Sequence, residues 1–214
     1  MPNSELLLRA LDERGVLRLT LNDPDRRNPL SEAMLETLHE AVMEAGENVD
    51  VRVIILAAKG PVYSAGHDLK EMTAGRKADD RGRAYFEKMM ALCSTVMQAI
   101  VLCPKPVIAE VNGVATAAGC QLVASCDLAV ATEGSSFITP GVNIGLFCST
   151  PMVALSRNVS NKHAMEMLLT GDTTSAQRAE EMGLINRVVA EKDLHATTDA
   201  LAALIASKSS HTLA

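Results

Sequence analysis

The sequence is poor in aromatic side chains: two Tyr, three Phe and no Trp make up 2% of its 214 residues. Stacking platforms for bases or sugars need several aromatic rings, so this composition argues against such sites. The 26 acidic residues outnumber the 20 basic ones and give a net charge of −6. A protein that neutralises many nucleic-acid phosphates is therefore not expected, and any anionic ligand must find a local basic spot.

Disulfide, membrane and export signals are also lacking. The five cysteines form no CxxC pair, and an odd number suits reduced thiols. No apolar run approaches the roughly 18 residues of a membrane span, and the start has no apolar stretch long enough for a signal peptide. We expect a cytoplasmic protein without disulfides or membrane contact.

Several familiar catalytic motifs are missing. The sequence contains no GxSxG, HExxH, GxxxxGK or GxGxxG, which excludes the commonest serine hydrolase, zincin, P-loop and dinucleotide-binding sites. One histidine, His67, lies in a long polar segment, residues 59–82, whereas the other four lie in or beside helical patterns. We expect this segment to lack regular structure and to carry function.

The sequence pattern predicts an α/β fold with repeated strand and helix units. Alternating apolar residues on both sides of a turn at 12–15 indicate a hairpin. Apolar residues at helical spacing follow Ser31, and the run VRVIILAA (51–58) is typical of a buried strand. A strand at 107–111 then leads through a small-residue turn into a helix near residues 118–125.

That small-residue turn is one of two segments whose residues indicate a chemical function. Gly113, Ala115, Ala117 and Ala118 leave the backbone uncovered where a helix begins. Exposed N–H groups at a helix N-terminus suit an anion or a polarised carbonyl oxygen, as in an oxyanion hole. Small residues also serve simply to let helices pack closely, and the turn alone does not decide between these interpretations.

The turn and the polar segment together resemble the enoyl-CoA hydratase/isomerase (crotonase) family. The resemblance is carried by SAGHDLKEM (64–72) and PVIAEVNGVATAAGCQLVASCDLAVA (106–131), and continues through DRRNPLS (25–31), SSFITPGVNIGLF (135–147) and MLLTGDTTSAQRAEEMGLINRVV (167–189). It implies a crotonase-like spiral of ββα repeats over residues 1–190. Residues 191–214 would begin a C-terminal helical segment, which in relatives is longer. Assembly as a homotrimer or hexamer, weakened by the short C-terminus, is a further expectation.

The resemblance also implies a coenzyme A thioester as ligand, with no separate cofactor or metal. Backbone N–H groups of His67 and Ala118 would hold the thioester oxygen. The His67 imidazole would either act as a base or turn away from the site. The first loop would receive the adenine, and nearby basic residues the phosphates; the implied residues are Ser64, Ala65, Gly66, Asp68, Leu69, Arg26, Arg27 and Lys70.

The sequence departs from the family at the acid and base. The two glutamates of family hydratases align with Gln121 and Gly141, neither of which ionises. A positioned acid or base contributes roughly 10²- to 10⁴-fold, so ordinary hydration of 2-enoyl-CoA should be slow. Cys120, Asn143, Cys148 and Thr150 are alternative groups near the acyl site. We therefore expect an acyl-CoA-binding family member in fatty-acid or acyl-CoA metabolism, either a lyase or isomerase or a non-catalytic binding protein.

Overall fold

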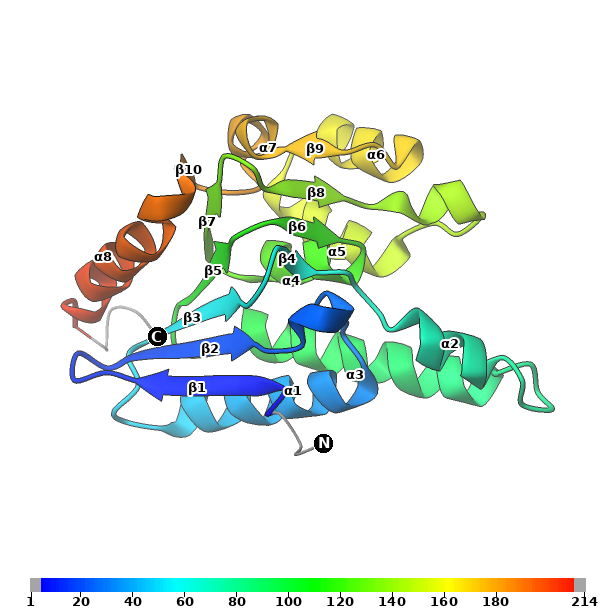
Figure 1. Ribbon diagram of the computed structural model, residues 1–214, viewed down its shortest axis with the longest axis horizontal. Coiled ribbons are helices and arrows are strands. Elements are labelled where there is room, and N and C mark those ends of the chain that lie inside the picture. The colour runs from blue at the N-terminus through cyan, green and yellow to red at the C-terminus, as the bar shows by residue number, and fades with distance from the viewer. Residues whose placement is uncertain (1–4, 210–214) are drawn as a thin grey trace.

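The computed structural model describes residues 5–209, which form two sheets wrapped by helices (Figure 1). The strands are β1 (Leu7–Leu11), β2 (Val16–Leu21), β3 (Val53–Ala58), β4 (Val62–Ser64), β5 (Val107–Val111), β6 (Val114–Thr116), β7 (Leu128–Thr132), β8 (Ser136–Ile138), β9 (Thr174–Ser175) and β10 (Arg187–Val189). The α-helices are α1 (Glu32–Glu47), α2 (Leu69–Gly75), α3 (Arg83–Val101), α4 (Ala118–Ser125), α5 (Ser149–Asn158), α6 (Asn161–Thr170), α7 (Ala176–Met182) and α8 (Leu194–Ala206). Short 3₁₀ helices are η1 (Pro24–Arg26), η2 (Pro140–Ile144) and η3 (Glu191–Asp193).

The chain alternates between two sheets. The larger sheet has the order β1-β2-β3-β5-β7-β10, parallel except for the β1–β2 hairpin. The smaller sheet has the order β4-β6-β8-β9, with only β9 antiparallel. The pairs β3/β4, β5/β6 and β7/β8 thus each place one strand in each sheet. Stacking of successive pairs produces the expected spiral of ββα repeats.

Two layers of helices cover the larger sheet. The helices α1 and α3 pack against each other on one side, and α8 contacts β3, β5 and β7 on the other (Figure 1). The α8 side is a small separate core that includes Val53, Ile55, Ile108 and Ala202. The predicted caps and spacings hold here: Ser31 accepts a hydrogen bond from the backbone N–H of Met34 and begins α1.

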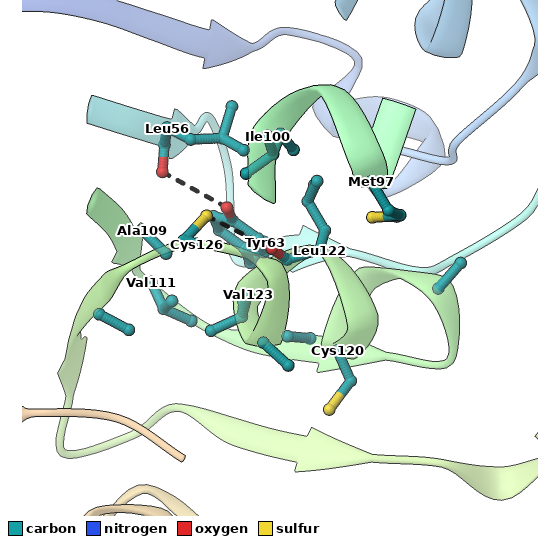
Figure 2. Close-up of a cluster of buried hydrophobic side chains, with 14 of the residues drawn as sticks. Leu56, Tyr63, Met97, Ile100, Ala109, Val111, Cys120, Leu122, Val123 and Cys126 are labelled. Atoms are coloured by element: carbon teal, nitrogen blue, oxygen red, sulfur yellow. Dashed lines mark hydrogen bonds between the residues drawn. The ribbon is translucent and has the colours of Figure 1, made fainter. Parts of the chain in front are cut away.

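The short helix α4 lies inside the molecule rather than on its surface. All eight of its residues are buried, and Leu122 and Val123 of α4 belong to the same buried cluster as Tyr63 of β4 (Figure 2). Tyr63 is fully buried and donates a hydrogen bond to the carbonyl oxygen of Leu56 over 3.4 Å. Burial of the whole helix fixes the direction in which the first N–H groups of α4 point.

The polar segment 59–82 is more regular than its composition suggested, which corrects the sequence-based expectation. It contains β4, which pairs with β6, and α2, which begins after Asp68. The Asp68 carboxylate accepts hydrogen bonds from the backbone N–H groups of Lys70 and Glu71. A three-residue strand and a seven-residue helix are too short to show periodicity, so pairing and capping rather than pattern define them.

Candidate acyl-thioester site

The loop after β4 and the start of α4 touch through glycine. Gly66 has φ +79°, and a Cβ placed on it would lie 2.9 Å from the carbonyl oxygen of Thr116 and 3.2 Å from the backbone nitrogen of Ala118. On α4, a Cβ on Gly119 would lie 2.5 Å from the carbonyl oxygen of Ser64. Only glycine permits both approaches, so the two segments that carry the family resemblance lie in direct contact.

The two segments in contact each carry a backbone donor without a backbone acceptor. Neither the His67 nor the Ala118 N–H has a backbone acceptor within residues 5–209. Ala118 is the first residue of α4, so its N–H has no partner inside the helix and the helix dipole adds partial positive charge there. Two fixed donors at an enclosed helix start can hold a carbonyl oxygen and stabilise negative charge that develops on it.

Backbone strain sits beside the Ala118 donor. Ala117 has φ 52° and ψ −119°, a conformation that residues with a Cβ rarely adopt. Its N–H donates to the carbonyl oxygen of Ile138 over 2.8 Å, and its carbonyl accepts from the N–H of Gln121. These bonds and the parallel pairing of β6 with β8 hold the strained turn. Such strain costs of the order of 1–3 kcal/mol and tends to occur at functional sites.

A buried asparagine that was not among the predicted site residues supports the first loop. Asn28 is fully buried with φ 49°, and its amide donates to the carbonyl oxygens of Lys59 and Val62, each over 2.8 Å. Its own carbonyl accepts from the Ser64 hydroxyl, which in turn accepts from the N–H of Gly66. The sequence signal for this role is an asparagine before proline, since asparagine tolerates positive φ.

Several predicted coenzyme-binding residues line one shallow pocket. It has a volume of about 280 Å³, and its lining combines two basic residues and two acidic ones with four others: Arg26, Lys70, Asp25, Asp68, Pro29, Ala65, His67 and Leu69. The Arg26 guanidinium forms an ion pair with Asp68, so Asp68 holds Arg26 at the pocket as well as capping α2. The pocket lining does not include Arg27, which is exposed and contributes its carbonyl as the acceptor for the N–H of Ala65.

The His67 imidazole lies inside the protein without a hydrogen-bond partner. Both ring nitrogens are enclosed, and neither is paired within the described residues. Burial lowers the pKa of His67 below its ordinary 6.5, because the charged imidazolium loses solvation. The ring is therefore neutral at pH 7 and available as an acceptor or donor, but it is not turned out to solvent.

Gln121 occupies the next turn of α4 after Ala118. It is 5% exposed, and its Oε1 is enclosed without a partner. The residue lines a groove of about 540 Å³ between α3 and α5, with α4 as the floor. Thr150 lines the same groove, whereas Asn143 and Cys148 do not. Cys120 is fully buried, and burial raises the pKa of its thiol to about 12, so it is a poor nucleophile.

Gly141 lies where backbone leaves no room for a side chain. Its φ is not positive, but a Cβ on it would lie 2.3 Å from the carbonyl oxygen of Leu146 and 2.7 Å from Sγ of Cys148. The N–H of Leu146 donates to the Gly141 carbonyl over 2.9 Å and closes this turn. The position therefore cannot accept a glutamate unless the turn 141–148 rearranges.

Two classes of site are absent from the part of the chain that the structure describes. Residues 5–209 bring no three His, Cys, Asp or Glu side chains together in a way that could hold a metal ion. No described helix combines the length and apolar content needed to cross a bilayer.

Comparison with known proteins identifies the family. Residues 12–214 match the family described as enoyl-CoA hydratase/isomerase. The chain belongs to the enoyl-CoA hydratase/isomerase family. A crystallised enoyl-CoA hydratase from Mycobacterium smegmatis is 54% identical with a TM-score of 0.93, covering 99% of this chain and 80% of that one. The crotonase fold predicted from the sequence is thus confirmed.

Curated relatives show the same membership. The mitochondrial enoyl-CoA hydratase domain-containing protein 3 of Mus musculus is 53% identical over 91% of this chain and 63% of its own length. The 4-chlorobenzoyl coenzyme A dehalogenase-1 of an Arthrobacter species is 32% identical over 92% of this chain and 71% of its own. The chain therefore spans less than two thirds of the mouse protein.

The expected cytoplasmic location is wrong. The mouse relative carries the designation mitochondrial, which contradicts an assignment that rested only on the lack of a long apolar stretch in the given residues and on the odd number of cysteines. Neither feature distinguishes the cytosol from other reducing compartments, so the sequence held no positive signal for that assignment.

Proposed function

We propose that this chain binds coenzyme A thioesters and holds the thioester oxygen between the backbone N–H groups of His67 and Ala118. The proposal is supported by the contact of Gly66 with the backbone of Thr116 and Ala118, because the residue after Gly66 and the first residue of α4 each have a backbone N–H with no backbone acceptor in the described residues. Both donors are backbone groups, so the unusual His67 side chain does not remove either of them. Polarisation of the thioester oxygen favours an enolate at the neighbouring carbon.

The pocket on the other side of His67 suits the coenzyme. Arg26 and Lys70 line it together with Asp25 and Asp68, and the two basic side chains are the groups that complement phosphate. The phosphates and adenine of the coenzyme would therefore lie against the loop 64–70, with Asp68 fixing Arg26. Coenzyme A enters as part of the substrate rather than as a resident cofactor.

Replacing Ala118 by Pro tests the oxyanion contact. Proline is tolerated at the first position of a helix, where it removes an N–H that has no helical partner. The variant should bind acetyl-CoA about fivefold more weakly, since one hydrogen bond contributes about 1 kcal/mol. Its affinity for S-ethyl-CoA, a thioether without the carbonyl, should not change. Calorimetry gives both values.

Asn161→Pro is the matched control, because Asn161 is the exposed first residue of α6. It should leave both affinities unchanged. If folded Ala118→Pro keeps the wild-type preference for the thioester over the thioether, the placement of the oxygen is wrong. If the wild type binds no coenzyme A thioester, the ligand assignment itself fails.

Hydration of 2-enoyl-CoA is not the reaction that this site favours. Gln121 cannot transfer a proton, and the backbone around Gly141 excludes a side chain. These two observations favour a second candidate, a non-catalytic acyl-CoA-binding or regulatory protein. A screen of acyl-CoA thioesters that follows both binding and turnover separates the two candidates: binding without turnover of any thioester identifies the second.

Assembly follows the family in this proposal. The turn between η2 and α5 exposes Ile144, Leu146 and Phe147, at 76%, 57% and 37% respectively. Contiguous exposed apolar side chains are typical of surfaces that contact another protein, which supports a homotrimer or hexamer. Light scattering over a dilution series gives the oligomeric state; a protein that is monomeric at every concentration contradicts the proposed assembly.

A further inference from the structure

The helix α8 is attached to the larger sheet by charged side chains as well as by apolar contacts. Its apolar contribution is limited to the small separate core that includes Ala202 and Ala206, on the side of the sheet away from α1 and α3 (Figure 1). Asp199 of α8 accepts a hydrogen bond from the guanidinium of Arg18 in β2 over 2.7 Å. A helix with few apolar contacts opens more easily than the rest of a fold, so its polar contacts strongly influence how firmly it is held.

A carboxylate from an interior strand joins this ion pair. Glu110 of β5 is 8% exposed and accepts a second hydrogen bond from Arg18 over 2.6 Å. The Arg18 side chain reaches it across β3, which separates β2 from β5 in the sheet. The other oxygen of Glu110, Oε2, is enclosed and has no hydrogen-bond partner among the described residues. Because a buried charged oxygen without a partner is unfavourable, this oxygen needs a further donor.

His195 of α8 lies against both carboxylates. Its Nδ1 is 3.7 Å from Oε2 of Glu110, and its Nε2 is 3.4 Å from Oδ2 of Asp199. Arg18 bonds to the other oxygen of each carboxylate. A neutral imidazole has one N–H and can donate to only one of the two oxygens that face it, whereas an imidazolium has two and can donate to both.

The charges of these four side chains balance only when His195 is protonated. Arg18 supplies one positive charge, while Glu110 and Asp199 supply two negative charges. The strands β3 and β7, which also contact α8, contain no titratable side chain. The second positive charge can therefore come from the imidazolium of His195.

Other charged groups near α8 have different partners or lie outside the cluster. Arg14 of the hairpin turn pairs with Asp12. At the opposite end of α8, Arg52 donates to the carbonyl oxygen of Ala206 over 2.7 Å. The short helix η3 also contacts α8, and none of its charged residues is within ion-pair distance of the cluster in the described residues: Glu191, Lys192 and Asp193.

We propose that His195 makes the attachment of α8 to the sheet pH-sensitive: protonation of its imidazole links Glu110 to Asp199 and holds the helix more firmly. Imidazole is the side chain that ordinarily gains its charge between about pH 8 and pH 5. The side chain of His195 is 66% exposed, so water delivers the proton without unfolding. Since the docked helix places two carboxylates against the imidazolium, proton uptake favours docking. This inference is independent of the proposed function.

Hydrogen exchange of the α8 amides at pH 7.5 and pH 5.5 tests the proposal. Protection factors remove the effect of pH on the intrinsic exchange rate, and a local readout is needed because burial of His67 gives global unfolding the opposite pH dependence. Wild-type α8 should be about threefold more protected at pH 5.5 than at pH 7.5, the size expected for a partly exposed ion pair. The helix α3, on the other side of the sheet, should show no such gain.

Two variants assign the gain to the cluster. His195→Gln keeps a polar side chain but cannot take up the proton, so its α8 protection should be the same at both pH values. Glu110→Gln leaves Arg18 and Asp199 to neutralise each other, so its gain should be smaller than that of the wild type. His39→Gln is the matched control and should keep the full gain, because the histidine ion pairs among the described residues all involve His195.

The opposite outcomes overturn the inference. They are equal α8 protection at both pH values in the wild type, a gain that survives in His195→Gln, or a full gain in Glu110→Gln with its fold confirmed by circular dichroism. Failure of the protein to bind coenzyme A thioesters would overturn the proposed function and leave this inference intact.

Discussion

The proposed site has two parts that are built in different ways: the donor side, formed by the backbone N–H groups of His67 and Ala118, and the acid/base side, formed by positions 121 and 141. The donor side consists of backbone N–H groups fixed by glycine contacts and by a helix with no exposed residue. On the acid/base side, position 121 carries a carboxamide and position 141 a glycine under a tight turn. A function made from backbone needs only small residues nearby, so it survives side-chain changes that abolish proton transfer.

The largest expected effect concerns proton transfer. Wild-type protein should hydrate a short 2-enoyl-CoA at least about 100-fold more slowly than a family hydratase with both carboxylates, measured by loss of the conjugated enoyl-thioester absorbance. Gln121→Glu restores one carboxylate above the donors and should raise the rate. Efficient wild-type hydration would show that other groups, such as His67, transfer the protons. It would contradict the claim that the site lacks an acid and a base.

The second prediction tests whether the backbone around position 141 excludes a side chain. Gly141→Ala should lower the free energy of unfolding by about 3 kcal/mol, because its Cβ meets the Leu146 carbonyl at 2.3 Å. Gly134→Ala is the control: no heavy atom lies within 4 Å of the added Cβ, so the change should stay within about 0.5 kcal/mol. Urea denaturation measures both. Equal stability of the two variants would mean that the turn yields easily and that a glutamate is tolerated there.

The third prediction concerns Asp68. Asp68→Ala removes the cap of α2 and frees Arg26, so it should cost about 1–2 kcal/mol of stability and weaken coenzyme A binding. Ser175→Ala removes the cap of the remote helix α7 and should lower stability alone. If Asp68→Ala binds coenzyme A normally, Asp68 does not position Arg26 for the phosphates.

The smallest effect is the pH dependence that His67 contributes. Burial lowers the pKa of His67 below 6.5, so the unfolded chain takes up this proton at a higher pH than the folded protein. The free energy of unfolding therefore decreases as the pH falls through about 6.5. In His67→Gln this loss should be smaller, as measured by urea unfolding near pH 7.5 and pH 5.5. An identical pH dependence in both proteins would indicate a solvated imidazole.

Much of the fold could be predicted from the sequence because its signals are local. The hairpin, the Ser31 cap and the helix 118–125 each follow from spacing or capping, and the family resemblance added the spiral. The division at residue 190 remains a prediction, and the last five residues of the expected C-terminal segment lie outside the described residues. The strand β4 and the helix α2 could not be predicted, since their stability comes from pairing with β6 and from the Asp68 cap.

The candidate site was predictable as a set of segments but not as a geometry. Contact between Gly66 and Ala118 and the burial of the His67 ring depend on residues distant in sequence. The steric closure at Gly141 comes from Leu146 and Cys148 folding back over it, which no local pattern reveals. Asn28 shows the same limit, because its hydrogen bonds reach Lys59 and Val62.

Isotope-edited infrared spectroscopy of a bound acyl-CoA tests the central claim most directly. A thioester carbonyl held by two backbone donors is polarised, so its stretching band should move to lower frequency on binding the wild-type protein. Ala118→Pro removes one donor and should reverse part of that movement, while Asn161→Pro should not. A carbonyl band that stays at its solution frequency in the saturated wild-type complex would contradict the account.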